Sequence, residues 1–255
     1  MDVPRLEVSE WSRFDGLVHG FLGRPAGQRG AAASCVKLSE NPDDEIETVK
    51  RNWCDLKMAT GLSQFTVVTA RQVHGNVILK VSNGTGKQAG VGDGLMTDAA
   101  NLVVGVTAAD CVPILYVEPE RRVAAAVHAG WRGTAAGVGV RAIMRMKEEY
   151  GIEPSVLHAA LGPSIGPCCY EVGGEVAEQI GANWAEELKR AWRPQGVKGY
   201  LDLRTLNKAQ LIAAGVPERQ IRRIGPCTAC HVGEFFSYRK EGKTGSQLSF
   251  IGWRS

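Results

Sequence analysis

The sequence predicts a single mixed α/β domain spanning residues 1–255, an α+β arrangement in which mixed β-sheets are flanked by helices. Two observations predict this fold class. Short β-branched or apolar runs, typical of strands, are interspersed with segments whose apolar residues recur every three or four positions, as on one face of a helix. Some runs are joined by tight turns and others by helical segments, so both hairpins and crossovers are expected. No internal repeat or low-complexity linker divides the chain.

The first predicted elements are a strand at 16–23, which contains His19, and a helix. The helix opens at Asn41-Pro42, because asparagine suits the N-cap and proline suits the first helical position. Its apolar face consists of residues spaced three and four apart, namely Ile46, Val49, Trp53 and Leu56. Gly61 follows the last of these residues and is expected to end the helix.

Two β-branched runs, at 65–69 and 77–81, predict the next strands, and the connection between them contains His74. Residues 83–94 are rich in glycine. They match neither a phosphate-binding loop nor a dinucleotide-binding fingerprint, so they are predicted to form a flexible surface loop rather than a nucleotide site.

Three buried strands are predicted at the centre of the chain, since the runs 102–107, 112–117 and 123–127 are almost continuously apolar. Residues 118–122 form the hairpin turn between the last two strands. The remaining predicted elements are a helix at 131–150 ended by Gly151, a strand at 156–161, a helix marked by Val176, Ile180, Trp184 and Leu188, a helix at 203–214 ended by Gly215, and a strand at 248–253.

Composition excludes several classes of function. A net charge of +3 without a basic run argues against nucleic-acid binding. No apolar run is long enough to span a membrane and no signal-peptide core follows the N-terminus, so no membrane association is expected and the predicted location is cytoplasmic. Seven cysteines, an odd number in 255 residues, favour reduced thiols over a disulfide framework.

Three potential metal ligands lie at the ends of predicted strands: His74, Cys111 and His128. Strand ends of one sheet can converge, and catalytic zinc sites use three protein ligands with a fourth position open. Taken singly, the cysteine is more typical of a buried small hydrophobe and each histidine of a turn or strand-end residue. The spacing alone therefore leaves a metal site and a set of structural residues as equal alternatives.

Charged residues near these ligands are candidates for catalysis and substrate binding. Asp110 precedes Cys111 and is suited to orienting an imidazole, accepting a proton or capping a turn. Arg132 lies at the predicted start of a helix, where a phosphate would meet both a guanidinium and backbone amides. Arg24, Arg71 and Arg239 are weaker candidates of the same kind, and surface exposure is the alternative for all of them.

Four further cysteines form a separate group, Cys168, Cys169, Cys227 and Cys230. Buried thiols are the favoured interpretation, followed by a disulfide or redox pair and then by a structural metal site. The metal site ranks last because adjacent cysteines do not easily bind one tetrahedral ion.

Several motifs together resemble the YfiH/LACC1 family, which is also described as purine nucleoside phosphorylase, laccase-domain polyphenol oxidase and peptidoglycan-editing factor. The motifs are Gln72-Val-His-Gly75, Asp93-Gly-Leu-Met-Thr97, Thr107-Ala-Ala-Asp-Cys-Val-Pro113, His128-Ala-Gly-Trp-Arg-Gly133, Gly162-Pro-Ser-Ile-Gly166, Asp202-Leu with Asn207, Cys227-Thr228 and Phe235-Phe-Ser-Tyr-Arg239. The resemblance runs from about His19 to the C-terminus. Two departures are Leu22-Gly23 and Ser246, where the family usually has Ser-Thr and Arg.

The resemblance implies a zinc ion bound by His74, Cys111 and His128. It also implies small-molecule substrates, with phosphorolysis of adenosine, inosine, guanosine and methylthioadenosine, and deamination of adenosine. In such chemistry a catalytic zinc lowers the pKa of water to about 7, Asp110 would move a proton, and Arg132 would supply positive charge to a phosphate.

Three alternatives stand beside this reading. Cys111 and His128 would serve as nucleophile and base of a cysteine hydrolase or amidase that edits peptidoglycan precursors. A copper polyphenol oxidase is disfavoured because the chain has five histidines and multicopper sites use many imidazoles. A zinc-stabilised interaction protein would have a closed coordination shell, unlike a site that keeps a position open.

Overall fold

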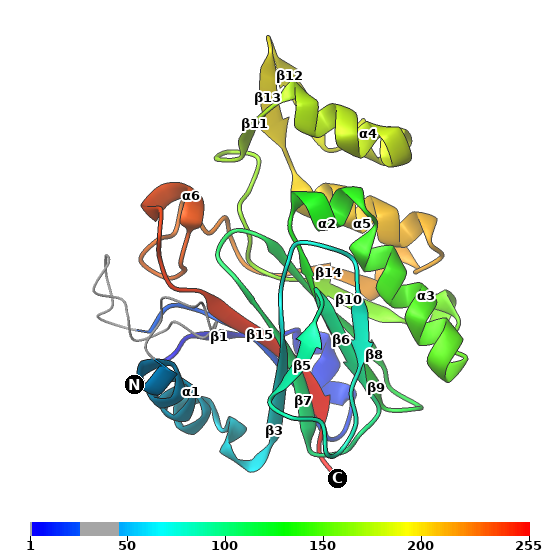
Figure 1. Cartoon of the computed structure of the whole chain (residues 1–255). Helices are drawn as coiled ribbons and strands as arrows, with labels where there is room; N and C mark the ends of the chain where they lie inside the picture. The colour runs from blue at the N-terminus through cyan, green and yellow to red at the C-terminus, as the bar shows by residue number, and fades with distance from the viewer. Residues whose placement is uncertain (1, 26–45) are drawn as a thin grey trace.

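Two six-stranded β-sheets lie face to face at the centre of the computed structural model, which describes residues 2–25 and 46–255 (Figure 1). The first sheet has the order β1 (Arg5–Leu6), β2 (Leu17–Leu22), β15 (Gln247–Trp253), β7 (Leu102–Ala108), β3 (Thr66–Arg71) and β5 (Gln88–Val91). The second has the order β14 (Ile221–Arg223), β10 (His158–Leu161), β8 (Val112–Glu118), β9 (Val123–Ala129), β6 (Gly94–Thr97) and β4 (Ile78–Lys80).

Both sheets are mixed, as the sequence predicts. β3 runs parallel to β5 and β7, whereas β15 is antiparallel to β2 and β7. In the second sheet β4 is parallel to β6 and β10 to β14, while β8 and β9 form the predicted antiparallel hairpin. The prediction of a mixed α/β fold is therefore confirmed.

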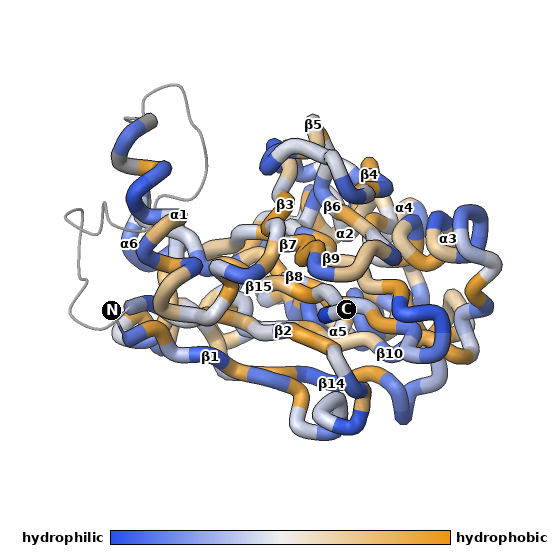
Figure 2. Tube along the Cα trace, turned by 90° about the horizontal axis from the view of Figure 1, so that it is seen from below, coloured by the Kyte–Doolittle hydropathy of each residue, from blue (hydrophilic) through white to orange (hydrophobic). Residues whose placement is uncertain are grey.

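Alternation along the strands divides the core into layers, because successive side chains of a strand point to opposite faces of its sheet. On β7, Leu102 and Val104 are buried between the two sheets, whereas Val103 points the other way into a cluster with Leu56 of a covering helix. This two-sided burial explains why the central strands appear in the sequence as nearly continuous apolar runs. Figure 2 shows the apolar strands inside and the hydrophilic segments towards the periphery.

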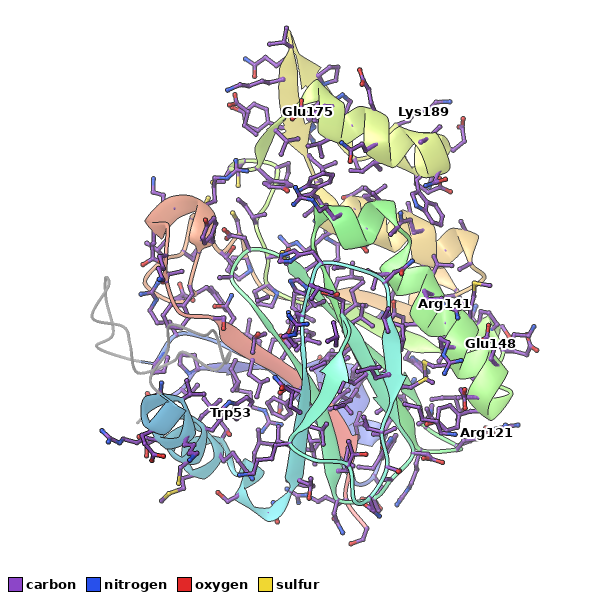
Figure 3. All side chains as sticks on the ribbon, in the orientation of Figure 1. Trp53, Arg121, Arg141, Glu148, Glu175 and Lys189 are labelled. Atoms are coloured by element: carbon purple, nitrogen blue, oxygen red, sulfur yellow. The ribbon has the colours of Figure 1, made fainter. Side chains whose placement is uncertain are left out.

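Helices cover the outer face of each sheet. α1 (Ile46–Thr60) lies against the first sheet, with Trp53 on the side that packs against the cluster (Figure 3). On the far side of the molecule α3 (Val138–Tyr150) and α5 (Leu203–Ala213) cover the second sheet (Figure 1). The ion pair between Arg141 and Glu148 lies on the outer side of α3 at 3.3 Å (Figure 3). Because exposed pairs contribute about 0–1 kcal/mol, the layers are held mainly by apolar burial.

The predicted helix ends match the structure where they can be compared. Gly61 and Gly151 follow the last residues of α1 and α3 in left-handed conformations, with φ of 72° and 65°. The predicted start of the first helix at Asn41-Pro42 lies outside the described residues. None of the helices in residues 2–25 and 46–255 is long and apolar enough to cross a membrane.

Two predictions about local structure are wrong. The helix predicted over 131–150 is divided into α2 (Trp131–Ala135) and α3, because Gly137 adopts a left-handed φ of 71° between them. A Cβ at Gly137 would lie 2.9 Å from Cζ2 of Trp184, so the Trp184 ring fills the space that a side chain at position 137 would need. The predicted loop 83–94 contains an edge strand, β5, that pairs with β3.

A third sheet that the sequence does not predict projects from one end of the molecule (Figure 1). It consists of β11 (Glu171–Gly173), β13 (Lys198–Leu201) and β12 (Trp192–Gln195), and it packs with α4 (Gly174–Leu188). Its strands are short and rich in polar residues, so they lack the alternation that reveals a strand. The remaining short helices are α6 (Tyr238–Glu241) and the 3₁₀ segments Ser9–Arg13, Leu62–Gln64, Pro154–Val156 and Glu218–Gln220.

Candidate metal centre

The three predicted ligands meet at one point, although they come from different parts of the chain. His74 lies in the connection after β3, Cys111 in the turn between β7 and β8, and His128 near the end of β9. One ligand atom from each lies within 4.8 Å of the others, and the two imidazole rings are 4.9 Å apart in an edge-on arrangement. Since β7 and β9 belong to facing sheets, the site forms where the ends of the two sheets come together.

Asp93 positions two of the predicted ligands, His74 and His128, through hydrogen bonds. Its fully buried carboxylate accepts the backbone amides of Val73, His74 and Gly75 at 3.2, 2.8 and 2.7 Å. These bonds hold His74 in a left-handed conformation with φ of 61°, which is uncommon for a residue with a side chain. The same carboxylate contacts Nδ1 of His128 at 3.0 Å.

The Asp93 contact also determines which nitrogen of His128 is available. A carboxylate is an acceptor, so Nδ1 carries the hydrogen and Nε2 keeps its lone pair for a metal or a thiol. The sequence interpretation missed this role for Asp93 and considered Asp110 as the orienting carboxylate instead. The signal in the sequence is weak, because Asp93 is simply an acid at the start of a strand, and its imidazole partner lies 35 residues away.

Gln72 and Gly130 complete the framework of the site. The side-chain amide of Gln72 donates to the carbonyl of Thr107 and accepts its backbone N–H, both at 2.8 Å, so it joins the end of β3 to the end of β7. A Cβ at Gly130 would lie 2.9 Å from Cδ2 of His74 and 3.0 Å from Sγ of Cys111. Only glycine leaves room for both ligands at this position.

The ligands perturb one another strongly. Burial raises the pKa of the Cys111 thiol, yet the imidazoles of His128 and His74 lower it overall to about 6. Burial lowers the pKa of His128, but the charge of Cys111 and the hydrogen bonds to Asp93 and Cys111 raise it to about 9. Between about pH 6 and pH 9, the metal-free site therefore holds the thiolate of Cys111 beside the imidazolium of His128. The thiolate is the form of cysteine that binds metals and attacks electrophiles.

A cavity of about 1180 Å³ opens over the three ligands. Three of the arginines predicted to bind substrate, Arg71, Arg132 and Arg239, line it together with Trp131 and Tyr170. The guanidinium of Arg132 lies 4.3 Å from the ring of Trp131, and that of Arg239 lies 5.0 Å from the ring of Tyr170. Positive charge and aromatic surface thus line the same cavity.

Two of the four predictions about arginines, those for Arg132 and Arg24, can be compared further with the structure. Arg132 lies at the start of a helix, as predicted, but this helix, α2, is only five residues long and ends before α3 begins. Arg24 lies away from the described lining: its buried guanidinium forms an ion pair with Glu241 and donates to the carbonyl of Phe235. A role of Arg24 in substrate binding stays a prediction.

Asp110 holds the loop around Cys111 in place. It has a positive φ of 96°, which is uncommon for a residue with a side chain. One carboxylate oxygen accepts the hydroxyl of Thr228 at 2.6 Å and the other accepts the backbone N–H of Arg239 at 2.7 Å. Its partners among the described residues include neither imidazole of the metal centre.

The two departures from the family motifs fall in different places. Leu22 and Gly23 lie at the end of β2, away from the described cavity lining, and Leu22 is buried. Ser246 lines the cavity with Thr244 and Gly245. An arginine at this position would have added positive charge to a wall that already holds Arg71, Arg132 and Arg239.

Four other cysteines, Cys168, Cys169, Cys227 and Cys230, form a second cluster rather than a set of buried thiols. Cys168 and Cys230 are exposed, Cys169 is half-buried and only Cys227 is buried. Their sulfurs lie within 4.8 Å of one another, which contradicts the interpretation that the sequence favoured. Among the described residues, this cluster and the trio around Cys111 are the groups of side chains able to hold a metal ion.

Comparison with known proteins relates this structure to a family and to several enzymes. Residues 18–254 match a family model described as multi-copper polyphenol oxidoreductase laccase. The purine nucleoside phosphorylase YlmD of Geobacillus stearothermophilus is 35% identical over 99% of this chain and 98% of its own. The adenosine deaminase RL5, from an unknown prokaryotic organism, is 34% identical over 83% of this chain and 84% of its own.

Solved structures share the fold. YfiH of Bacillus licheniformis has a TM-score of 0.88 at 29% identity and covers 98% of this chain and 96% of its own. YlmD of Geobacillus stearothermophilus has a TM-score of 0.86 at 35% identity, with coverage of 95% and 93%. These similarities extend over nearly the whole chain, including both six-stranded sheets.

Proposed function

The chain belongs to the multi-copper polyphenol oxidoreductase laccase family, and we propose that it is a zinc-dependent purine nucleoside enzyme. The observation that carries this proposal is the convergence of His74, Cys111 and His128 in the wall of a large cavity. The names of the relatives YlmD and RL5 support purine nucleosides as the substrate class.

The donor set suits one zinc ion. Two imidazoles and one thiolate are ligands that zinc prefers, and three protein ligands leave a position open towards the cavity. Asp93 leaves Nε2 of His128 unprotonated for coordination, and Gly130 provides the space in which the ligands approach one another. When bound there, zinc would act as a Lewis acid and lower the pKa of water in the site.

Cavity residues supply the binding of a nucleoside and a phosphate. Trp131 and Tyr170 offer flat apolar surface to a purine ring. The guanidinium groups of Arg71, Arg132 and Arg239 offer charge-assisted hydrogen bonds to phosphate oxygens. A cavity of about 1180 Å³ exceeds the roughly 300–1,000 Å³ typical of small-molecule sites, which leaves room for two reactants.

In phosphorolysis, a phosphate oxygen would form a bond to C1′ of the ribose while the glycosidic C–N bond breaks. The purine leaves with the electron pair of that bond and takes up a proton, and the sugar is released as ribose 1-phosphate. The arginines stabilise the phosphate and hold it on the side of C1′ opposite the base. We assign Asp110 to positioning Cys111 and Arg239, since both its oxygens already accept hydrogen bonds from the protein.

Adenosine deamination is the second proposed activity, and it differs in needing water instead of phosphate. The experiment that tests both compares wild-type protein with Cys111→Ala. Release of hypoxanthine from inosine should require phosphate, whereas conversion of adenosine to inosine should not. The variant should lose both. Turnover that is equal in wild type and variant would contradict the proposal.

A cysteine hydrolase or amidase acting on peptidoglycan precursors is the alternative with a specific observation in its favour. The pKa values of Cys111 and His128 are shifted in opposite directions, as in a nucleophile and base pair. Metal analysis separates the two functions. Zinc bound by Cys111 would occupy the lone pairs that attack requires, so a hydrolase of this kind would be most active after treatment with a chelator, and a zinc enzyme least active.

Copper is the second alternative, because two imidazoles and one thiolate also form the ligands of blue-copper sites. The two possibilities differ in colour. A copper–thiolate centre absorbs strongly in the visible range, whereas zinc protein is colourless. The trio provides one mononuclear centre, and the five histidines of the chain are few for the imidazole-rich clusters of multicopper oxidases.

A further inference from the structure

Four cysteine thiols from two distant segments meet at the surface of the molecule: Cys168, Cys169, Cys227 and Cys230. Cys230 Sγ lies 3.4 Å from Cys169 Sγ and 3.5 Å from Cys168 Sγ, and every pair of sulfurs lies within 4.8 Å. In a tetrahedral site with Zn–S bonds of about 2.3 Å, the sulfurs stand roughly 3.8 Å apart. The four sulfurs are therefore already spaced as the corners of such a site.

We propose that these four cysteines bind one zinc ion as a second, structural metal site, separate from the centre at Cys111. All four positions would be filled by thiolates, which is the closed coordination of structural zinc. The proposal rests on the geometry of this cluster and does not depend on the proposed nucleoside activity.

The local backbone explains how adjacent cysteines reach the same ion. The amides of Cys169 and Tyr170 both donate to the carbonyl of Gly166 at 3.0 Å, so the segment forms a tight turn. In a strand, neighbouring side chains would point to opposite faces. In this turn both sulfurs of the Cys168-Cys169 pair lie within reach of Cys230, which removes the objection raised from the sequence.

The second half of the site has the spacing of known zinc ligands. Cys227 and Cys230 form a C-x-x-C pair, a common half-site of zinc-binding modules. The backbone N–H of Gly166 donates to Sγ of Cys227 at 3.1 Å. Such a bond favours the thiolate over the thiol, because it stabilises the negative charge. The contact also joins the two segments directly.

A buried arginine beside the cluster supplies compensating charge. Arg204 is 8% exposed and its Nη1 donates to the carbonyl of Gly225, yet its Nε has no hydrogen-bond partner among the described residues. Burial and the positive charge of Arg223 lower the pKa of Arg204, whereas the negative charges of Asp202, Cys227 and Cys168 raise it. Four thiolates around Zn²⁺ carry a net charge of −2, so the proposed site would add to Asp202 in compensating the buried guanidinium.

Other uses of the four thiols agree less well with the geometry. A disulfide would join two of them at about 2.05 Å and leave the other two without a role. An iron–sulfur cluster needs space for inorganic sulfide between its cysteines, and sulfurs in van der Waals contact leave none. A single tetrahedral ion uses all four sulfurs.

The site would stabilise the wall of the catalytic cavity. Thr228, between the two ligands of the second half, donates its hydroxyl to Asp110 at 2.6 Å, and Ile165 donates its amide to the Asp110 carbonyl at 2.9 Å. Tyr170, which follows Cys169, lines the cavity. A metal that joins the segments 166–170 and 227–230 therefore fixes the loop that carries Asp110 and Cys111.

Metal analysis of the full-length chain in a Cys111→Ala background tests this proposal without relying on activity. After purification with reductant and zinc, followed by desalting, Cys111→Ala should retain one equivalent of zinc. Adding Cys168→Ser and Cys230→Ser should remove it. Adding Cys54→Ser instead, a change to an exposed cysteine outside the cluster, should leave it in place. Zinc content that does not respond to Cys168→Ser and Cys230→Ser would overturn the proposal.

Cobalt titration of the metal-free, reduced Cys111→Ala protein provides a measurement that does not require the cluster variants to fold. One equivalent of Co²⁺ should produce the intense sulfur-to-cobalt charge-transfer absorption of a tetrahedral tetrathiolate site, and zinc should displace it. Absence of that absorption would contradict the proposal. So would an intact mass of the untreated protein lower by two hydrogens, with the missing pair mapped to a disulfide between two of these cysteines.

Discussion

The carboxylate of Asp93 lies 3.0 Å from Nδ1 of His128, and both side chains are buried. The same carboxylate holds the backbone of the segment that carries His74. One buried acid therefore orients an imidazole of the metal centre and fixes the loop of a second ligand. Residues placed in this way govern the affinity of a site although they never touch the metal.

Asp93→Asn should weaken zinc binding at the centre by about 10- to 100-fold, the usual effect of removing such a partner. Asparagine keeps the shape but loses the charge, and it replaces one of the two acceptor oxygens with a nitrogen that cannot accept the hydrogens Asp93 binds. Zinc affinity is measured by competition with a chromophoric chelator. Affinity within twofold of the wild type would show that the contact is not needed to orient His128.

Gly130→Ala should reduce zinc affinity and activity together. The added methyl group would lie 2.9 Å from Cδ2 of His74 and 3.0 Å from Sγ of Cys111, so the two ligands must move apart. Gly86→Ala is the matched control, since a Cβ there meets no atom within 4 Å. Equal zinc affinity in the two variants would contradict the requirement for close approach at Gly130.

The reactivity of Cys111 should depend on pH in a way that reveals its neighbours. Because His128 and His74 lower the pKa of the thiol to about 6 despite burial, the thiolate of the metal-free protein forms as pH rises through 6. Alkylation by iodoacetamide, followed by peptide mass mapping at Cys111, should therefore show its inflection near pH 6. His128→Ala should shift the inflection upwards. An inflection near the ordinary cysteine value of about 8.5 in wild-type protein would contradict the coupling.

Arg132→Ala should raise the KM for phosphate about tenfold to a hundredfold, the range expected for a lost charge-assisted hydrogen bond of about 1.5–3 kcal/mol. Adenosine deamination uses no phosphate, so it should be affected much less. The two activities are measured on the same preparation. An equal loss in both would indicate that Arg132 serves the purine site or the structure instead.

Sequence reasoning predicted the elements whose signals are local. The sequence predicted the strands β7, β8 and β9 from their apolar runs, and the ends of α1 and α3 from the glycines that follow them. Each of these signals depends on residues close together in the chain. The three candidate ligands were also singled out, since histidine and cysteine at predicted strand ends are suited to binding a metal. Their convergence at one point still needed the resemblance to a known family.

Features that depend on distant partners were not predicted. Arg24 becomes a buried ion-pair residue because Glu241 lies beside it, 217 positions later in the sequence. The break at Gly137 is accompanied by packing of Trp184 from another helix. The cysteine cluster depends on a turn that brings Cys168 and Cys169 to the same side as Cys230. No pattern within a short window contains this information.

Removal and return of zinc test the central proposal most directly. Chelator-treated wild-type protein should lose phosphate-dependent release of hypoxanthine from inosine, and added zinc should restore it. Cys111→Ala should stay inactive after the same addition. Full phosphorolytic activity in protein shown to be free of metal, or equal recovery in Cys111→Ala, would contradict a catalytic zinc at His74, Cys111 and His128.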